Sequence, residues 1–162
     1  MPDSYQEMCV DMLFDAGADV IIGGHPHVVE PMEIREITNP GGMTRTGYVI
    51  YSMGNFISSQ RYENGVMKDI GLILDMEFEK NGNETRLTGW NFAPTYVYWT
   101  DDVIGVVPVL EAYENRDQYA FLSEKDWGRI EDSYSKTIKT LTAITDCPYE
   151  IKDYRYIFQI TQ

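Results

Sequence analysis

The sequence predicts an α/β fold with a mixed sheet, antiparallel hairpins and flanking helices. Near its start, a helical spacing of apolar residues leads directly into a short, continuously apolar run. Such a run is typical of a parallel strand that helices cover. Further along, segments of alternating apolar and polar residues predict half-buried antiparallel strands, and a long amphipathic pattern near the C-terminus predicts another helix.

The charge balance excludes several classes of partner. The 162 residues include 26 acidic and 13 basic side chains, which give a formal net charge of −13. Binding to a phosphate backbone needs clustered Lys and Arg, so we expect no nucleic-acid partner. No run of 18 apolar residues occurs, so we expect no membrane span in this segment. The two cysteines, Cys9 and Cys147, are too few for a disulfide scaffold, and whether they pair stays open.

The first predicted element is a helix over Ser4–Ala16. Ser4 and Glu7 have the spacing of a capping box, in which each side chain satisfies a free backbone N–H of the first turn. Gly17 follows as a terminator. We expect the buried face to consist of the apolar residues at helical spacing, with Cys9 as a core thiol: Tyr5, Met8, Cys9, Met12, Leu13 and Ala16.

A strand over Asp19–Ile22 should follow, buried on both faces and entering the loop that begins at Gly23-Gly24. In α/β sheets, ligands bind beyond the carboxyl ends of the strands, which is where this loop lies.

The middle of the chain predicts four further strands, Met32–Ile37, Tyr48–Met53, Ile70–Phe78 and a return strand from Thr85 to Trp99. Asn81-Gly82 between the last two indicates a type I′ hairpin turn.

Near residue 107 the pattern becomes mostly helical, so we divide the chain into residues 1–107 and an extension over residues 108–162. The extension should hold a short helix ending at Asn115 and a longer one over Glu124–Thr142. The start of the longer helix is set by Ser123 and Asp126. Its apolar stripe consists of Trp127, Ile130, Tyr134, Ile138 and Leu141, and the alternating tail over residues 154–160 predicts a final strand.

The only two histidines of the sequence are His25 and His27, on either side of Pro26. Neutral imidazole is a common ligand of zinc, manganese and iron. In a tight turn after a strand, two such rings can point into one crevice, and Pro26 stiffens the backbone between them. The alternative is a surface loop with no functional role.

Two motifs in order resemble the CapA family of capsule-biosynthesis proteins. The first runs from Gly17 to Val28 as GADVIIGGHPHV, and the second, YSMGNF, occupies residues 51–56. This family is linked to poly-γ-glutamate capsules and has a calcineurin-like metallophosphoesterase fold, an α-β-β-α sandwich. The resemblance covers about residues 1–107 and implies the C-terminal half of such a domain.

In that superfamily the Gly-His-x-His motif gives one histidine to each ion of a two-metal centre. The resemblance therefore implies that His25 and His27 bind divalent metal ions such as Mn, Fe or Zn. The other ligands of the superfamily lie N-terminal to this motif, and no histidine precedes His25 here. We therefore expect an incomplete centre, no assigned catalytic residue, and an inactive fragment that needs the missing N-terminal half as its partner. A sheet exposed by that absence would favour a homo-oligomer.

Three further residues are candidates for lining the site. Gly24 lets the backbone pass close to a ligand. Asn55 has two possible roles: its amide contacts the substrate or a metal-bound water, or it caps its own turn. Arg61 either holds a carboxylate or phosphate through its planar guanidinium or is a solvated loop residue. Glu30 and Glu33 flank the histidine loop and either support it or face solvent.

The resemblance implies the C-terminal part of a CapA-like capsule or poly-γ-glutamate biosynthesis protein, a metal-dependent phosphoesterase-type hydrolase when complete. It also implies an extracellular, cell-surface location beside the capsule machinery. The first alternative is a non-catalytic binding or scaffold component of a cell-surface polymer assembly system, because one fold can carry many functions. The second is a plain interaction domain in which the His-Pro-His sequence is incidental.

Overall fold

The computed structural model describes residues 1–160 and has the predicted α/β character, with helices flanking two sheets. Its elements in chain order are α1 (Ser4–Asp15), β1 (Val20–Ile22), β2 (Met32–Thr38), β3 (Thr44–Ile50), β4 (Ile70–Asn81), β5 (Glu84–Trp99), β6 (Ile104–Pro108), α2 (Val109–Glu114), the 3₁₀ helix η1 (Arg116–Tyr119), α3 (Glu124–Leu141), β7 (Tyr149–Lys152) and β8 (Arg155–Phe158).

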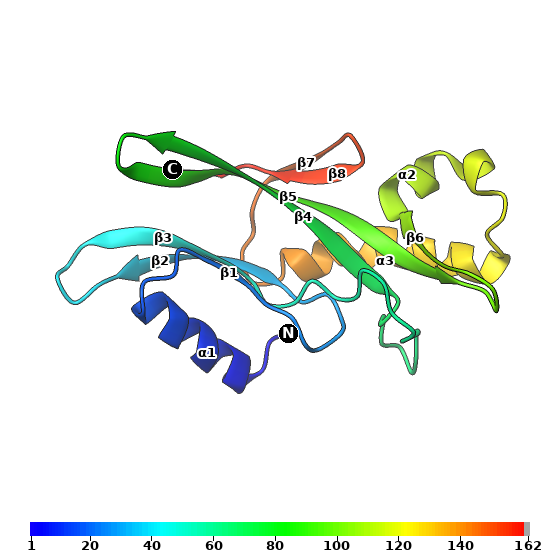
Figure 1. The fold of residues 1–162 in the computed structure, drawn as a ribbon, viewed down its shortest axis with the longest axis horizontal. Helices are drawn as coiled ribbons and strands as arrows, with labels where there is room; N and C mark the ends of the chain where they lie inside the picture. The colour runs from blue at the N-terminus through cyan, green and yellow to red at the C-terminus, as the bar shows by residue number, and fades with distance from the viewer. Residues whose placement is uncertain (161–162) are drawn as a thin grey trace.

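The strands form a three-stranded sheet and a five-stranded sheet (Figure 1). In the smaller sheet the order is β1-β3-β2, with β1 parallel and β2 antiparallel to β3, so the mixed sheet and the parallel strand are confirmed. The larger sheet has the order β4-β5-β8-β7, and β6 pairs with the far end of β5. Among residues 1–160, strand β1 is thus an edge strand that pairs with β3 alone.

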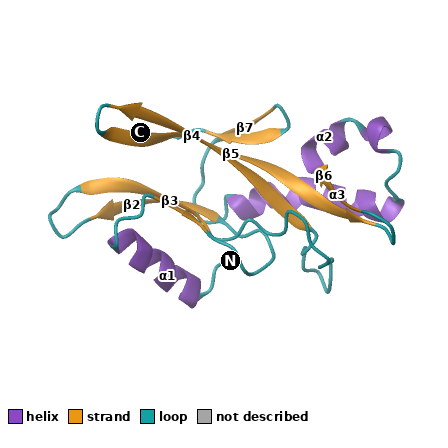
Figure 2. Ribbon diagram, in the orientation of Figure 1, coloured by secondary structure: helices purple, strands orange, loops and turns teal. Residues whose placement is uncertain are grey.

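The elements pack in layers around three clusters of apolar residues. Helix α1 covers one face of the smaller sheet, where Val10 and Phe14 meet Val49 and Tyr51. The opposite face of that sheet packs against the larger sheet, in a core that includes Met32, Tyr48, Ile50, Leu72, Trp90 and Phe92. Helices α2 and α3 pack on the larger sheet toward its other end, away from α1 (Figure 2).

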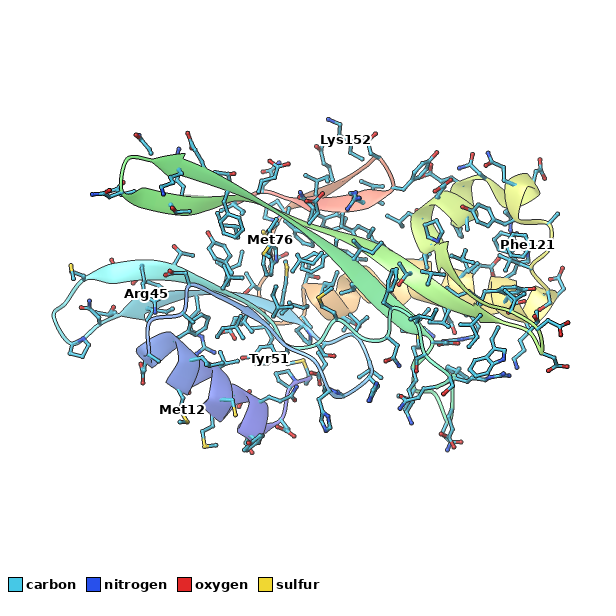
Figure 3. The ribbon with its side chains drawn as sticks, in the orientation of Figure 1. Met12, Arg45, Tyr51, Met76, Phe121 and Lys152 are labelled. Carbon is cyan, nitrogen blue, oxygen red and sulfur yellow. The ribbon has the colours of Figure 1, made fainter. Side chains whose placement is uncertain are left out.

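Helix α1 forms as predicted, but its cap and its buried face differ from the prediction. The capping box is made by Asp3 and Gln6 instead of Ser4 and Glu7. Only Val10 and Phe14 are buried; Cys9 is half-buried, so its prediction as a core thiol is wrong. The predicted apolar stripe lies mostly outward, with exposed side chains at Tyr5, Met8, Met12 and Leu13. Figure 3 shows Met12 on the side of α1 that faces away from the sheet.

Three strand predictions need correction. Strand β1 is not covered on both faces: Ile22 is 52% exposed, and among residues 1–160 no strand pairs with the outer edge of β1. The strand expected over Tyr48–Met53 is β3, which begins earlier, at Thr44, because Thr44 to Gly47 also pair with β2. The β4–β5 hairpin has the expected place, but its turn residues are Gly82 and Asn83. Only Gly82 has positive φ, so the turn is type II′ instead of I′.

The C-terminal helices match the prediction more closely. Ser123 and Asp126 form the capping box of α3, and the predicted apolar stripe faces the core. The final strand exists as β8 and pairs with β5, while β6 and β7 were not predicted. The division at residue 107 stays a prediction.

Candidate metal-binding loop

The two histidines lie in the loop that follows β1, at the carboxyl end of the parallel strand. The Gly23 N–H donates a 2.8 Å hydrogen bond to the Ile50 carbonyl of β3. A Cβ atom at Gly23 would lie 2.2 Å from the Tyr51 carbonyl oxygen, so only glycine permits this approach. The glycine therefore fixes the point at which the histidine loop leaves the sheet.

Both histidines have left-handed backbone conformations, with φ of 94° at His25 and 61° at His27. This region costs a non-glycine residue about 1–3 kcal/mol, so it persists only where surrounding contacts impose it. Strain of this kind is concentrated at functional sites. The conformation therefore favours a functional loop over an incidental one.

The His27 ring is held by Asn55, from the turn that follows β3. The Asn55 amide nitrogen donates to two carbonyls, 2.8 Å to Lys68 and 3.3 Å to His27. The amide orientation is thereby set, and Asn55 Oδ1 lies 2.8 Å from His27 Nδ1. An amide oxygen can only accept, so Nδ1 carries the proton, and Nε2 of the neutral ring has a free lone pair. This is the arrangement by which outer partners orient metal-ligating histidines.

Two glycines bring the Asn55 turn to this place. Gly54 has φ of 68° and forms an isolated bridge with Gly71 at the start of β4. A Cβ atom at Gly71 would lie 2.2 Å from the Asn55 carbonyl oxygen. The role of Gly71 was not predicted, because nothing near it in the chain indicates that another segment approaches so closely. The only signal for this role is the glycine itself, which pairs with Gly54 of the Gly-Asn-Phe turn.

The two histidines can serve as part of a metal centre. Their ring centroids are 6.3 Å apart and the ring planes are inclined by 45°. His25 is exposed and, within residues 1–160, makes no hydrogen bond, so its ring nitrogens are free. Among the same residues, no cluster of three or more His, Cys, Asp or Glu could hold a metal ion. Zinc sites normally use at least three protein ligands, so these two rings would need further ligands.

The two acidic residues beside the loop, Glu30 and Glu33, both accept hydrogen bonds from neighbouring side chains. Glu30 is buried and accepts a 2.5 Å hydrogen bond from Gln6 of α1. Glu33 accepts hydrogen bonds from Arg35 and, at 2.8 Å, from the Tyr51 hydroxyl. Burial raises the pKa of Glu33, but these hydrogen bonds outweigh burial and leave the pKa below its ordinary value of 4.5. The Glu30 carboxylate therefore contacts α1, and the Glu33 carboxylate contacts Arg35 of β2 and Tyr51 beside β3.

An apolar groove of about 560 Å³ borders the loop between α1 and β1. It is lined by Gly24 and His25 together with apolar side chains that include Cys9, Leu13 and Ile22. Arg61, in contrast, lines a different cavity, where its guanidinium lies over the Trp99 ring. The structure thus places Gly24 and Asn55 at the histidine loop and does not bring Arg61 into contact with it.

No helix among residues 1–160 is long and apolar enough to cross a membrane.

Comparison with known proteins identifies relatives of the N-terminal part of the chain. Residues 1–60 match the family model of the bacterial capsule synthesis protein PGA_cap. Over 81 residues, half of this chain, the sequence is 35% identical to the PGA biosynthesis protein CapA of Bacillus subtilis (strain 168). It is 33% identical over 72 residues, 44% of the chain, to the capsule biosynthesis protein CapA of Bacillus anthracis.

These matches cover 18% and 15% of the two relatives, so the matched part of the chain spans less than a fifth of their length. No solved structure was found to match the chain.

Proposed function

We propose that the chain is the C-terminal part of a capsule or poly-γ-glutamate biosynthesis protein of the CapA family, because its residues 1–60 match the model of that family. When complete, this protein is a metal-dependent phosphoesterase-type hydrolase. The observation that carries the proposal is the hydrogen bond between His27 and Asn55, which leaves the Nε2 lone pair of His27 free for a metal ion.

In this proposal, His25 and His27 each bind one divalent ion, of the kind Mn, Fe or Zn. Bound ions supply Lewis-acid activation of water and of a phosphate group. The residues of this chain position the ligands: Gly23 and Pro26 fix the loop, and Asn55 holds the His27 ring and its tautomer. The remaining ligands come from the rest of the domain.

The surfaces around the histidine loop are suited to packing against further segments of the same domain. The outer edge of β1 has no partner strand among residues 1–160, and Ile22 there is half-exposed. Beside it, α1 presents exposed apolar side chains, including Met12 and Leu13. An open parallel edge next to an apolar helix face suits further strands and helices of one domain. We place the complete protein at the cell surface, with the capsule machinery.

The alternative is a non-catalytic scaffold in the same polymer assembly system. Such a scaffold would use the same fold without turnover, because function depends on the site and not on the fold.

Hydrolysis by the longest natural polypeptide that carries this segment tests the proposal. After treatment with EDTA, re-addition of Mn²⁺ should restore hydrolysis of 4-nitrophenyl phosphate, and His27→Ala should abolish the restored activity. Lys80→Gln, a change in the distant β4–β5 hairpin, is the control and should retain it. Metal binding without hydrolysis of this ester or of a wider set of phosphoesters would instead support the scaffold.

A further inference from the structure

A second cavity, of about 440 Å³, lies outside the histidine loop. It is enclosed by the loop over residues 60–62, the end of β5 and the start of α3. Its walls are rich in aromatic rings, contributed by Tyr62, Tyr96, Tyr98, Trp99 and Phe121. Phe121 lies at the end of the molecule opposite α1, near α3 (Figure 3). We call this cavity the aromatic pocket.

Two of the three cations that line the aromatic pocket, Arg61 and Lys125, form no ion pair within residues 1–160, although Lys125 lies close enough to Asp126 to lower the pKa of that carboxyl group. The Arg61 guanidinium carbon lies 4.3 Å from the centre of the Trp99 ring, and within residues 1–160 neither Arg61 nor Lys125 makes a hydrogen bond or ion pair. A guanidinium stacked on a ring keeps its in-plane N–H groups free for an oxyanion. Arg61 thus brings to this cavity a positive charge without an acidic partner among the described residues, in a chain with a net charge of −13.

The third cation and the acidic residues of the pocket are already engaged. Arg129 donates to both carboxylate oxygens of Asp69, at 3.0 and 3.1 Å, and also to Asp132. Asp126 accepts hydrogen bonds from the Tyr96 hydroxyl and from Ser123. These contacts build the walls and leave Arg61 and Lys125 as the groups available to a ligand.

One further polar group in the pocket lacks a partner. The Gln60 side-chain oxygen Oε1 is buried and accepts no hydrogen bond from any described residue. Buried polar atoms are normally paired, so an unpaired acceptor in a cavity suits a ligand that carries an N–H or O–H donor.

From these features we propose that the aromatic pocket binds a small ligand, or the end of a chain, that carries a carboxylate or phosphate next to an apolar or planar part. Arg61 and Lys125 bind the anionic group, the aromatic walls cover the apolar part, and Gln60 accepts a hydrogen bond. This site is separate from the histidine loop and does not depend on a bound metal.

Binding of two probe anions to the 162-residue chain tests this inference. Hippurate offers a carboxylate, an amide N–H and a ring, and phenyl phosphate offers a phosphate and a ring. The indole N–H resonance of Trp99 is one of only three from tryptophan and reports binding directly. We expect at least one probe to shift it, with a dissociation constant on the order of 1 mM for a ligand of this size.

Variants and a neutral probe distinguish recognition of the anionic group from non-specific apolar binding. Arg61→Gln should weaken binding by about tenfold, since it removes charge-assisted hydrogen bonds, while Lys80→Gln removes an equal charge in the β4–β5 hairpin and should have no effect. Hippuramide, the neutral analogue, should bind more weakly than hippurate. The proposal is overturned if neither anion shifts the Trp99 resonance, if Arg61→Gln binds like the original chain, or if hippuramide binds as tightly as both anions.

Discussion

Replacing Asn55 with Ala tests whether one side chain sets the chemistry of His27. Asn55 is 7% exposed and makes two hydrogen bonds of 2.8 Å, to His27 Nδ1 and the Lys68 carbonyl. Each such bond contributes about 1 kcal/mol net, and the Lys68 carbonyl would lose the Asn55 donor. We therefore expect a loss of about 2–3 kcal/mol in the free energy of unfolding. For a chain of this size, that loss lowers the melting temperature by roughly 4–12 °C.

The tautomer of His27 gives a readout that loss of stability alone would not change. In protein labelled with ¹⁵N-histidine, only two imidazole rings contribute signals, from His25 and His27. At a pH where both rings are neutral, we expect the proton of His27 on Nδ1. In Asn55→Ala the proton should move toward Nε2, while the His25 signals stay unchanged.

Asn91→Ala is the matched control, because Asn91 is equally buried but has no contact with either histidine, and its Oδ1 is unpaired. This variant should leave the His27 tautomer as it was. Our explanation would be refuted by a His27 ring protonated on Nε2 in the unmodified chain. It would equally be refuted by an Nδ1 proton that persists without Asn55.

Three further predictions follow from the same contacts. Gly71→Ala should cost at least about 1–3 kcal/mol and disturb the Asn55 turn, whereas Gly128→Ala, in open space on α3, should add about 1 kcal/mol in urea unfolding; equal stability of the two variants would contradict this. The hydrogen bonds that lower the Glu33 pKa contribute stability above pH 4.5, and this contribution is lost as the pH falls through the lower folded-state value. Unfolding measured from pH 2 to 6 should therefore show that Glu33→Gln costs less in acid, and parallel pH profiles would speak against this. Ile22→Lys at the open edge of β1 should reduce concentration-dependent self-association in light scattering, and a monomeric unmodified chain would argue against an adhesive edge.

The sequence predicted those elements that depend on residues close together in the chain. The parallel strand β1, the capped helix α3 and the β4–β5 hairpin follow from apolar spacing, capping residues and a turn glycine. The face of α1 could not be predicted in the same way. Val10 and Phe14 form a second apolar stripe, and the sheet selects which stripe is buried.

The candidate site was predicted only in part. The histidine motif was visible because both rings lie within three residues, whereas the contact of His27 with Asn55 joins residues 28 apart. That contact depends on a close approach of two backbones at Gly71, which the amino-acid pattern around each residue does not indicate. For the same reason the stacking of Arg61 on Trp99, far along the chain, could not be predicted.

The central claim is that His25 and His27 are metal ligands. Elemental analysis of the longest natural polypeptide that carries this segment, purified and dialysed against metal-free buffer, tests it most directly. We predict bound divalent metal in the unmodified protein and its loss in the folded His25→Ala/His27→Ala double variant. An unchanged metal content in the folded double variant would contradict the claim.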